Sequence, residues 1–175
     1  MDQLINDLGT GEKRLLQVIP KIYRNINDFY KLENPRDPIS KTHPGQYNFL
    51  TRPIEQIITQ LYLVEKFLIA NNKGRRFVDA GSGYGNVMQI ARCFDFDVWG
   101  IENNQDYIDN IPDEFIKSRT IYGDIFDQSY DYDVVYSFHP FSDPIQEARW
   151  EAFILKAPGI IIGNDFAGED NIWLV

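Results

Sequence analysis

From Arg76 onward, short apolar runs alternate with stretches of helical spacing, and this alternation constrains the fold more than any other feature of the chain. The runs are continuous in apolar character, as expected for strands of a sheet that is buried on both faces. The predicted strands are 77–80, 98–101, 120–125, 134–138 and 160–162. Strands that alternate with helices favour an α/β fold with a doubly wound, mostly parallel sheet.

Helices are predicted between these strands. Apolar residues at helical spacing predict one helix over 87–94, and a weaker helix over 107–116 is interrupted by Pro112. Residues 127–132 are too few for a normal helical crossover between parallel strands. Asp143 is expected to cap a helix that runs to about residue 156, because a proline and a glutamine follow it in the first turn.

Ahead of the strands, residues 1–45 are predicted to form a helical extension or lid on a main domain that spans 46–175. The extension carries one apolar stripe at helical spacing, and Pro20 within it predicts a break just before the proline and a restart at it. A second helix is predicted over 52–71, with Thr51 as its N-cap.

Composition excludes several classes of protein. Cys93 is the only cysteine, so an intramolecular disulfide and a cysteine-cluster metal site are both excluded, and no metal is expected. No apolar run approaches the roughly 20 residues that a membrane-spanning helix needs, and the N-terminus is polar and acidic. We therefore expect a cytoplasmic protein with no membrane partner.

Charge is distributed unevenly along the chain. Residues 1–76 hold 12 Lys and Arg against 8 Asp and Glu, whereas residues 77–175 hold 5 against 18, which gives the net charge of -9. An acidic surface repels a nucleic-acid backbone and attracts cationic partners. The alternative is that these carboxylates only keep the domain soluble.

A glycine-rich turn, Asp79-Ala80-Gly81-Ser82-Gly83-Tyr84-Gly85, lies where the first strand gives way to a helix. Glycines there let the backbone approach a ligand closely. The dinucleotide fingerprint would need a further glycine at Asn86, and the nucleotide-phosphate loop motif is absent. Asp79 is a poor neighbour for a pyrophosphate and suits a ligand with a positively charged amino group.

Two further carboxylates follow the next two strands. Glu102 ends the second strand, about 20 residues beyond the turn, where an acidic side chain can accept both hydroxyls of a ribose. Asp124 ends the third, beside the adenine end of the same crevice. Each acid alone could be a loop acid or helix cap, but together they predict a site at the carboxyl ends of the strands.

The three motifs, Asp-x-Gly-x-Gly-x-Gly, Gly-Ile-Glu and Gly-Asp-Ile-Phe, resemble motifs I to III of the class I (seven-β-strand, Rossmann-like) methyltransferases over roughly 76–165. The resemblance implies a transferase that uses S-adenosyl-L-methionine. It places Gly81 and Gly83 along the methionine and ribose, and Asp79 near the amino group. Glu102 would hold the ribose hydroxyls, and Asp124 the adenine amino group. The implied cofactor-binding set is Tyr47, Thr51, Asp79, Gly81, Ser82, Gly83, Gly85, Glu102, Asn103, Asp124, Ile125 and Ser137, with Ile125 against the adenine ring.

The methyl acceptor is expected at the end of the fourth strand, which carries Ser137 and His139 as the catalytic candidates. The Asn/Asp-Pro-Pro-Tyr signature of base N-methyltransferases is absent there, which disfavours a nucleic-acid acceptor. His139 could be a general base or merely a strand-end histidine bonded to backbone. A strong base is optional, because displacement at a sulfonium depends mainly on alignment of donor and acceptor.

The segment before the second helix resembles, loosely, that of seven-strand protein-lysine methyltransferases, with Tyr47 and Thr51 at the positions that close over the cofactor. They could equally be a core tyrosine and a helix cap. The preferred acceptor is therefore a lysine of a basic protein or peptide. A small-molecule or nucleic-acid methyltransferase remains an alternative, as does a catalytically silent cofactor-binding scaffold.

The family fold continues after its fifth strand with a helix and an antiparallel hairpin, whereas here only 164–175 remain, enough for one strand at 172–175. The sheet edge is therefore expected to be incomplete: a minimal variant, an edge supplied by a partner, or a sequence that ends early. An uncovered edge strand is an association site, which would allow a homo-oligomer.

Overall fold

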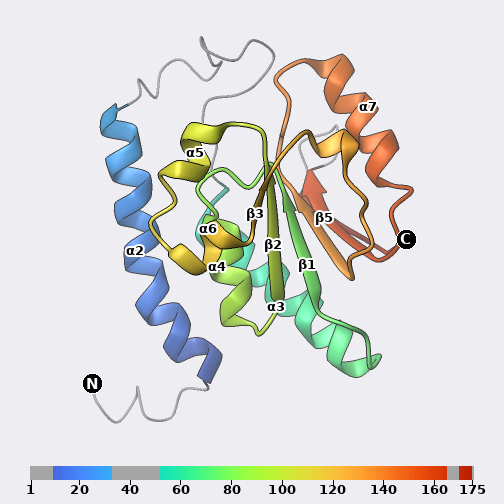
Figure 1. The fold of residues 1–175 in the computed structure, drawn as a ribbon. Helices are drawn as coiled ribbons and strands as arrows, with labels where there is room; N and C mark the ends of the chain where they lie inside the picture. The colour runs from blue at the N-terminus through green and yellow to red at the C-terminus, as the bar shows by residue number, and fades with distance from the viewer. Residues whose placement is uncertain (1–9, 33–51, 165–169, 175) are drawn as a thin grey trace.

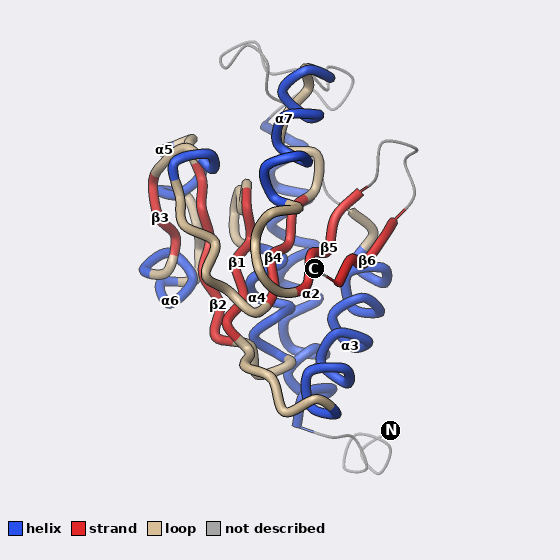
Figure 2. Tube along the Cα trace, turned by 90° about the vertical axis from the view of Figure 1, so that its right-hand side faces the viewer, coloured by secondary structure: helices blue, strands red, loops and turns tan. Residues whose placement is uncertain are grey.

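The computed structural model describes residues 10–32, 52–164 and 170–174, and within them one six-stranded sheet runs in the order β3-β2-β1-β4-β5-β6 (Figure 2). The first five strands pair in parallel and β6 pairs antiparallel with β5, so the predicted doubly wound, mostly parallel sheet is confirmed. The strands are β1 (Arg76–Ala80), β2 (Asp97–Glu102), β3 (Thr120–Tyr122), β4 (Val134–Ser137), β5 (Ile160–Asn164) and β6 (Asp170–Leu174).

Helices lie on both faces of the sheet (Figure 1). They are α2 (Thr10–Leu32), α3 (Ile54–Ala70), α4 (Asn86–Cys93), α5 (Gln105–Asp109), α6 (Glu114–Ser118), the 3-10 helix η1 (Ile125–Asp127) and α7 (Pro144–Ile154). On one face, side chains of α2, α3 and α4 form a buried cluster with Phe77 and Tyr136 of the sheet. On the other face, Trp150 of α7 and Ile125 of η1 cluster with Val78.

Alternation along the strands decides which side chains face which layer. Phe77 packs toward α3 and α4 and Val78 toward α7, so Asp79 lies on the α3 side. Tyr136 pairs in register with Asp79 and lies on the same side. Asp79 of β1 and Tyr136 of β4 therefore share the face of the sheet that α3 covers.

The later predicted elements form close to their expected bounds. The third strand is shorter than expected, because Asp124 turns the chain and caps η1. The weak helix over 107–116 is two short helices, capped by Asn104 and Asp113, on either side of Pro112. The side chain of Asp143 accepts a hydrogen bond from the Ile145 amide, as expected for the N-cap of α7.

The predicted break at Pro20 is wrong, because α2 runs unbroken from Thr10 to Leu32. Pro20 lies on the exposed side of the helix, where water can solvate the carbonyl that loses its partner. Leu15 and Ile22, on either side of the proline, are buried in the cluster with α4. Tertiary packing thus outweighs the cost of the proline.

The second helix also begins differently from expectation. Helix α3 starts at Ile54 with Pro53 in the N-cap position, in place of the expected Thr51, and no side chain caps it. Thr51 itself lies outside the described residues. One face of this helix packs into the core, with Ile57, Leu61 and Val64 almost fully buried.

The strand expected at 172–175 is β6, which begins two residues earlier and extends the sheet beyond β5. In the part of the chain that the structure describes, β3 and β6 are the edges of the sheet (Figure 2). Within that same part, no helix is long and apolar enough to cross a membrane. A cytoplasmic location and a homo-oligomer through a sheet edge stay predictions.

Candidate functional site

The glycine-rich turn folds back onto β2. Gly81, Gly83 and Gly85 all have positive φ angles, of 85°, 53° and 70°, a region that glycine enters without steric cost. The amides of Gly81 and Ser82 both donate to the carbonyl of Ile101, at 2.9 and 3.0 Å. The Gly83 amide donates to Glu102 Oε2 at 2.8 Å, so all three amides form hydrogen bonds within the protein.

This geometry supports the exclusion of a phosphate site. A phosphate cradle needs several backbone amides aimed at the ligand. Here the amides of Gly81, Ser82 and Gly83 point to β2, and a carboxylate occupies the position next to them. The turn therefore offers an acidic surface, which suits a cationic or hydroxyl-bearing ligand.

Glu102 is fixed in place by two backbone amides. Its Oε2 accepts from Gly83, and its Oε1 accepts from Asn104 at 2.8 Å, while the residue is 7% exposed. A carboxylate has about four acceptor positions, so these two bonds do not saturate it. Glu102 can therefore keep its orientation and also accept hydroxyl donors from a ligand.

Asp79 lies beside Glu102 and is 3% exposed. Its neighbours in register are Gly100 on β2 and Tyr136 on β4. Burial and the nearby charge of Glu102 raise the pKa of Asp79 to about 8, because both disfavour the ionised form. A cation placed between these two acids would reverse that preference and bind tightly.

Buried polar atoms around the turn point to a ligand. Ser82 Oγ, together with Oδ1 and Nδ2 of Asn86, is buried with no hydrogen-bond partner among the described residues. A buried polar atom without a partner costs about 1–3 kcal/mol, which a bound ligand can recover. Sequence reasoning used Asn86 only to reject the dinucleotide motif, although a polar residue opening the helix after three glycines was a signal for a ligand contact.

The residues expected around the adenine lie at the same edge of the sheet. The Gly123 amide donates to the Glu102 carbonyl at 3.0 Å, which joins the end of β3 to that of β2. Asp124 is exposed and one of its oxygens accepts from Phe126, whereas Ile125 is buried on the α7 face. Asn103 is exposed between Glu102 and α5. Their contacts with a cofactor stay predictions.

At the end of β4 the two catalytic candidates diverge. Ser137 Oγ accepts a hydrogen bond from Trp150 Nε1 at 2.8 Å and is buried under α7, so its side chain packs on the face opposite to Asp79. His139 has a left-handed φ of 42°, and its Nδ1 lies 3.5 Å from Glu147 Oε1. Pro140 packs 3.6 Å from where a Cβ would sit on Gly81, so this loop lies against the turn.

Glu147, in α7, is a residue that sequence reasoning missed. Its carboxylate contacts His139 and also accepts a hydrogen bond from the Phe141 amide at 3.2 Å, so it contacts the β4–α7 loop at two points. Burial raises its pKa to about 7. Its signal was an acid one turn into a helix that follows a histidine. Of the other predicted residues, Tyr47 and Thr51 lie outside the described residues.

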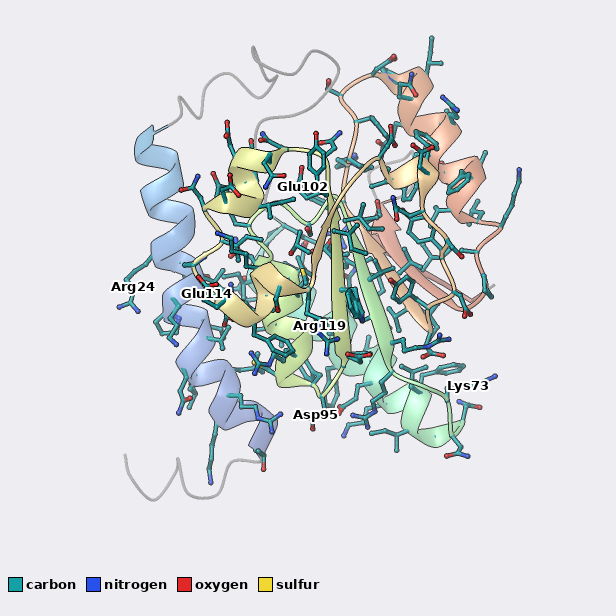
Figure 3. The ribbon with its side chains drawn as sticks, in the orientation of Figure 1. Arg24, Lys73, Asp95, Glu102, Glu114 and Arg119 are labelled. Atoms are coloured by element: carbon teal, nitrogen blue, oxygen red, sulfur yellow. The ribbon has the colours of Figure 1, made fainter. Side chains whose placement is uncertain are left out.

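The described residues hold no group of side chains that could bind a metal ion. They also form a hollow lined by Arg14 of α2, Cys93 of α4 and Asp95, which follows α4. It lies at the opposite end of the sheet from Glu102 (Figure 3). It therefore takes no part in the site around the turn.

Neither a family model nor a curated protein matches the sequence. Solved structures do match. WbdD has a TM-score of 0.52 at 14% identity, over 65% of this chain and 30% of WbdD. A proposed RNA methyltransferase from Pyrococcus horikoshii has a TM-score of 0.50 at 18% identity, over 65% of this chain and 61% of its own. An RNA methyltransferase from Salinibacter ruber, in complex with S-adenosyl-L-homocysteine, has a TM-score of 0.49 at 19% identity, over 66% and 78%.

At sequence identities this low, the structural similarity shows a shared fold alone. The chain therefore has the Rossmann-like fold of the class I methyltransferases, as the three sequence motifs predicted. In such a sheet the ligand crevice lies where the strand order reverses, outside the carboxyl ends of the strands. That point is between β1 and β4, where the glycine-rich turn meets the Pro140 loop.

Proposed function

We propose that this chain is an S-adenosyl-L-methionine-dependent methyltransferase. One observation carries the proposal: two buried carboxylates, Asp79 and Glu102, flank a glycine-rich turn at the switch point of the sheet. S-adenosyl-L-methionine carries an ammonium, a sulfonium and a ribose diol, and so it matches two acids better than a phosphate-bearing nucleotide does. The fold shared with a proposed RNA methyltransferase adds support.

The cofactor fits the residues present. Glu102 would accept the ribose hydroxyls, since its orientation is fixed by Gly83 and Asn104. Asp79 would bind the ammonium, which compensates its burial. The partnerless polar atoms of Ser82 and Asn86 would gain hydrogen bonds. Gly81 and Gly85 would line the turn, with Asp124, Asn103 and Ile125 at the adenine end and Tyr47 and Thr51 closing over the opposite end.

When bound, the cofactor supplies an electrophilic methyl group to a lone pair of the acceptor. The protein then has to align the acceptor and receive a proton where one is released. His139 lies on the loop beside Gly81, and its contact with Glu147 favours a proton on Nδ1, which leaves Nε2 as the basic nitrogen. We assign His139 the role of base. Ser137 contributes by holding Trp150 against β4.

The proposed acceptor is an amine of a basic protein or peptide, with lysine as the preferred side chain. Support comes from the charge of residues 77–175, which carry 18 acidic against 5 basic side chains. An RNA acceptor is the second candidate, because a protein of this fold from Pyrococcus horikoshii is described as a proposed RNA methyltransferase. A small-molecule acceptor and a silent, cofactor-binding scaffold are the other outcomes of the test.

Calorimetric titration with S-adenosyl-L-methionine and S-adenosyl-L-homocysteine tests the proposal. We expect binding of both, and absence of binding at millimolar ligand would refute it. Labelled cofactor incubated with cell extract then separates the acceptor classes. Label that protease removes and nuclease leaves supports the protein acceptor. The reverse pattern identifies RNA, label in small molecules identifies a metabolite, and binding without transfer identifies a scaffold.

A further inference from the structure

An arginine that the motifs did not include is buried at the same edge of the sheet. Arg52 precedes α3 and is 2% exposed. Its Nη1 donates to the side-chain oxygen of Gln60, also buried, at 2.8 Å. Its guanidinium carbon lies 4.7 Å from the ring centroid of Phe138 and 5.8 Å from that of Tyr136. A permanently charged guanidinium is thus buried beside a neutral amide and two aromatic rings.

Arg52 lies on the face that also carries the two acids. Tyr136 pairs in register with Asp79, and both side chains project toward α3. Arg52 lies over Tyr136 and over Phe138, the residue that follows β4. The buried Arg52 cation over β4 and the buried carboxyl of Asp79 on β1 therefore lie at neighbouring strands, at the switch point. Glu102 lies one strand further, on β2.

The order of Glu102, Asp79 and Arg52 across the sheet matches the order of the ribose, ammonium and carboxylate groups in the proposed cofactor. The strands β2, β1 and β4 are consecutive in the sheet, about 4.8 Å apart. They present Glu102, then Asp79, then the guanidinium of Arg52. The cofactor presents a ribose diol, then an amino acid whose ammonium and carboxylate are joined to one carbon. Guanidinium groups bind carboxylates through two parallel hydrogen bonds.

We propose that Arg52 binds the carboxylate of the cofactor's methionine end, opposite Asp79, which binds its ammonium. This inference rests on the proposed function. It assigns a positive side chain of the segment before α3 to a site otherwise lined with acids, and it makes the site selective for an intact amino acid. Gln60 holds the guanidinium in position from α3.

The experiment compares two ligands and two proteins. The ligands are S-adenosyl-L-homocysteine and its decarboxylated analogue, which keeps the amine, the ribose and the adenine. The variant is Arg52→Gln, and the control is Arg24→Gln, an exposed arginine on α2 whose side chain points away from the sheet (Figure 3). Dissociation constants are measured by calorimetry.

We expect the wild-type protein to bind the intact ligand roughly 10- to 100-fold more tightly than the decarboxylated one, the range of charge-assisted hydrogen bonds. Arg52→Gln removes that preference by weakening the intact ligand alone, and Arg24→Gln keeps it. An Arg52→Gln protein that keeps the preference, or that loses both ligands equally while still folded, overturns the inference. Wild-type protein that binds neither ligand overturns the proposed function itself.

Because Arg52 is buried, its removal can also unfold the protein, which thermal melting detects. In that case Arg52→Lys decides, since it keeps the charge and loses the paired geometry. A folded Arg52→Lys protein is expected to retain part of the preference for the intact ligand. If that variant keeps the full wild-type preference, Arg52 does not form a bidentate contact with the carboxylate, and the inference is overturned.

Discussion

The buried carboxyl of Asp79 makes the stability of the unliganded protein depend on pH. Its pKa is raised to about 8 in the folded protein by burial and by Glu102, against an ordinary value of 3.8. Between these values the folded chain holds a proton that the unfolded chain releases. Stability from this group is therefore fully present below about pH 4 and is lost as pH rises toward about 8.

Asp79→Asn removes this proton and keeps the shape of the side chain. Each pH unit in the window is worth about 1.4 kcal/mol for one proton. From about pH 5 to about pH 7, the stability of the variant should therefore rise by roughly 3 kcal/mol relative to the wild-type protein. Urea unfolding followed by tryptophan fluorescence at several pH values measures the difference.

A matched substitution, Asp127→Asn, changes an exposed acid on η1 and should leave the difference flat over the same range. The reasoning about Asp79 is refuted if Asp79→Asn and Asp127→Asn show the same pH dependence. Such a result would mean that Asp79 is ionised in the unliganded protein. Its burial would then be compensated by contacts other than a bound proton.

Further predictions follow from the same site. Cofactor binding near neutral pH should release a proton from Asp79, which appears as a binding enthalpy that differs between phosphate and Tris buffers; equal enthalpies would argue against the ammonium contact. Glu102→Ala should weaken cofactor binding by about 1–3 kcal/mol, and an unchanged dissociation constant would show that Glu102 does not bind the ribose. Ser137→Ala leaves the indole of Trp150 unpaired and should cost about 1–3 kcal/mol of unfolding free energy, seen in urea titrations, with cofactor affinity retained. His139→Ala should lower the rate of methyl transfer by roughly 100-fold or more with little effect on cofactor affinity, and a wild-type rate would leave His139 a structural residue.

Sequence periodicity predicted the sheet well because its strands are buried on both faces. Val78 and Val134 belong to apolar runs too short for helices, and the glycines between Asp79 and Asn86 mark the end of the first strand. Local signals failed where tertiary contacts decided the outcome. Pro20 did not break α2, since packing of Ile22 against the core compensated for the lost hydrogen bond.

The acids of the candidate site were predictable from sequence, and its cation was not. Glu102 ends β2, Asp79 is the last residue but one of β1, and Asp124 lies two residues beyond β3, and strand ends can be located from apolar runs alone. Arg52 is separated from β1 by an entire helix, and no local pattern indicates that its side chain returns to the sheet. Only the packing of α3 against β4 brings it over Tyr136.

The motif residues, which lie on or just after strands, account for the contacts to only part of the proposed ligand. The motif residues lie on consecutive strands, whose spacing is fixed by the backbone of the sheet. They therefore hold the ribose and ammonium at positions that depend little on the rest of the chain. Arg52 and the His139–Glu147 pair depend on α3 and α7, which pack on opposite faces. The residues that select between intact and truncated cofactor, and that receive the acceptor's proton, are thus set by helix packing, where chains of this fold can differ without altering the glycine-rich turn.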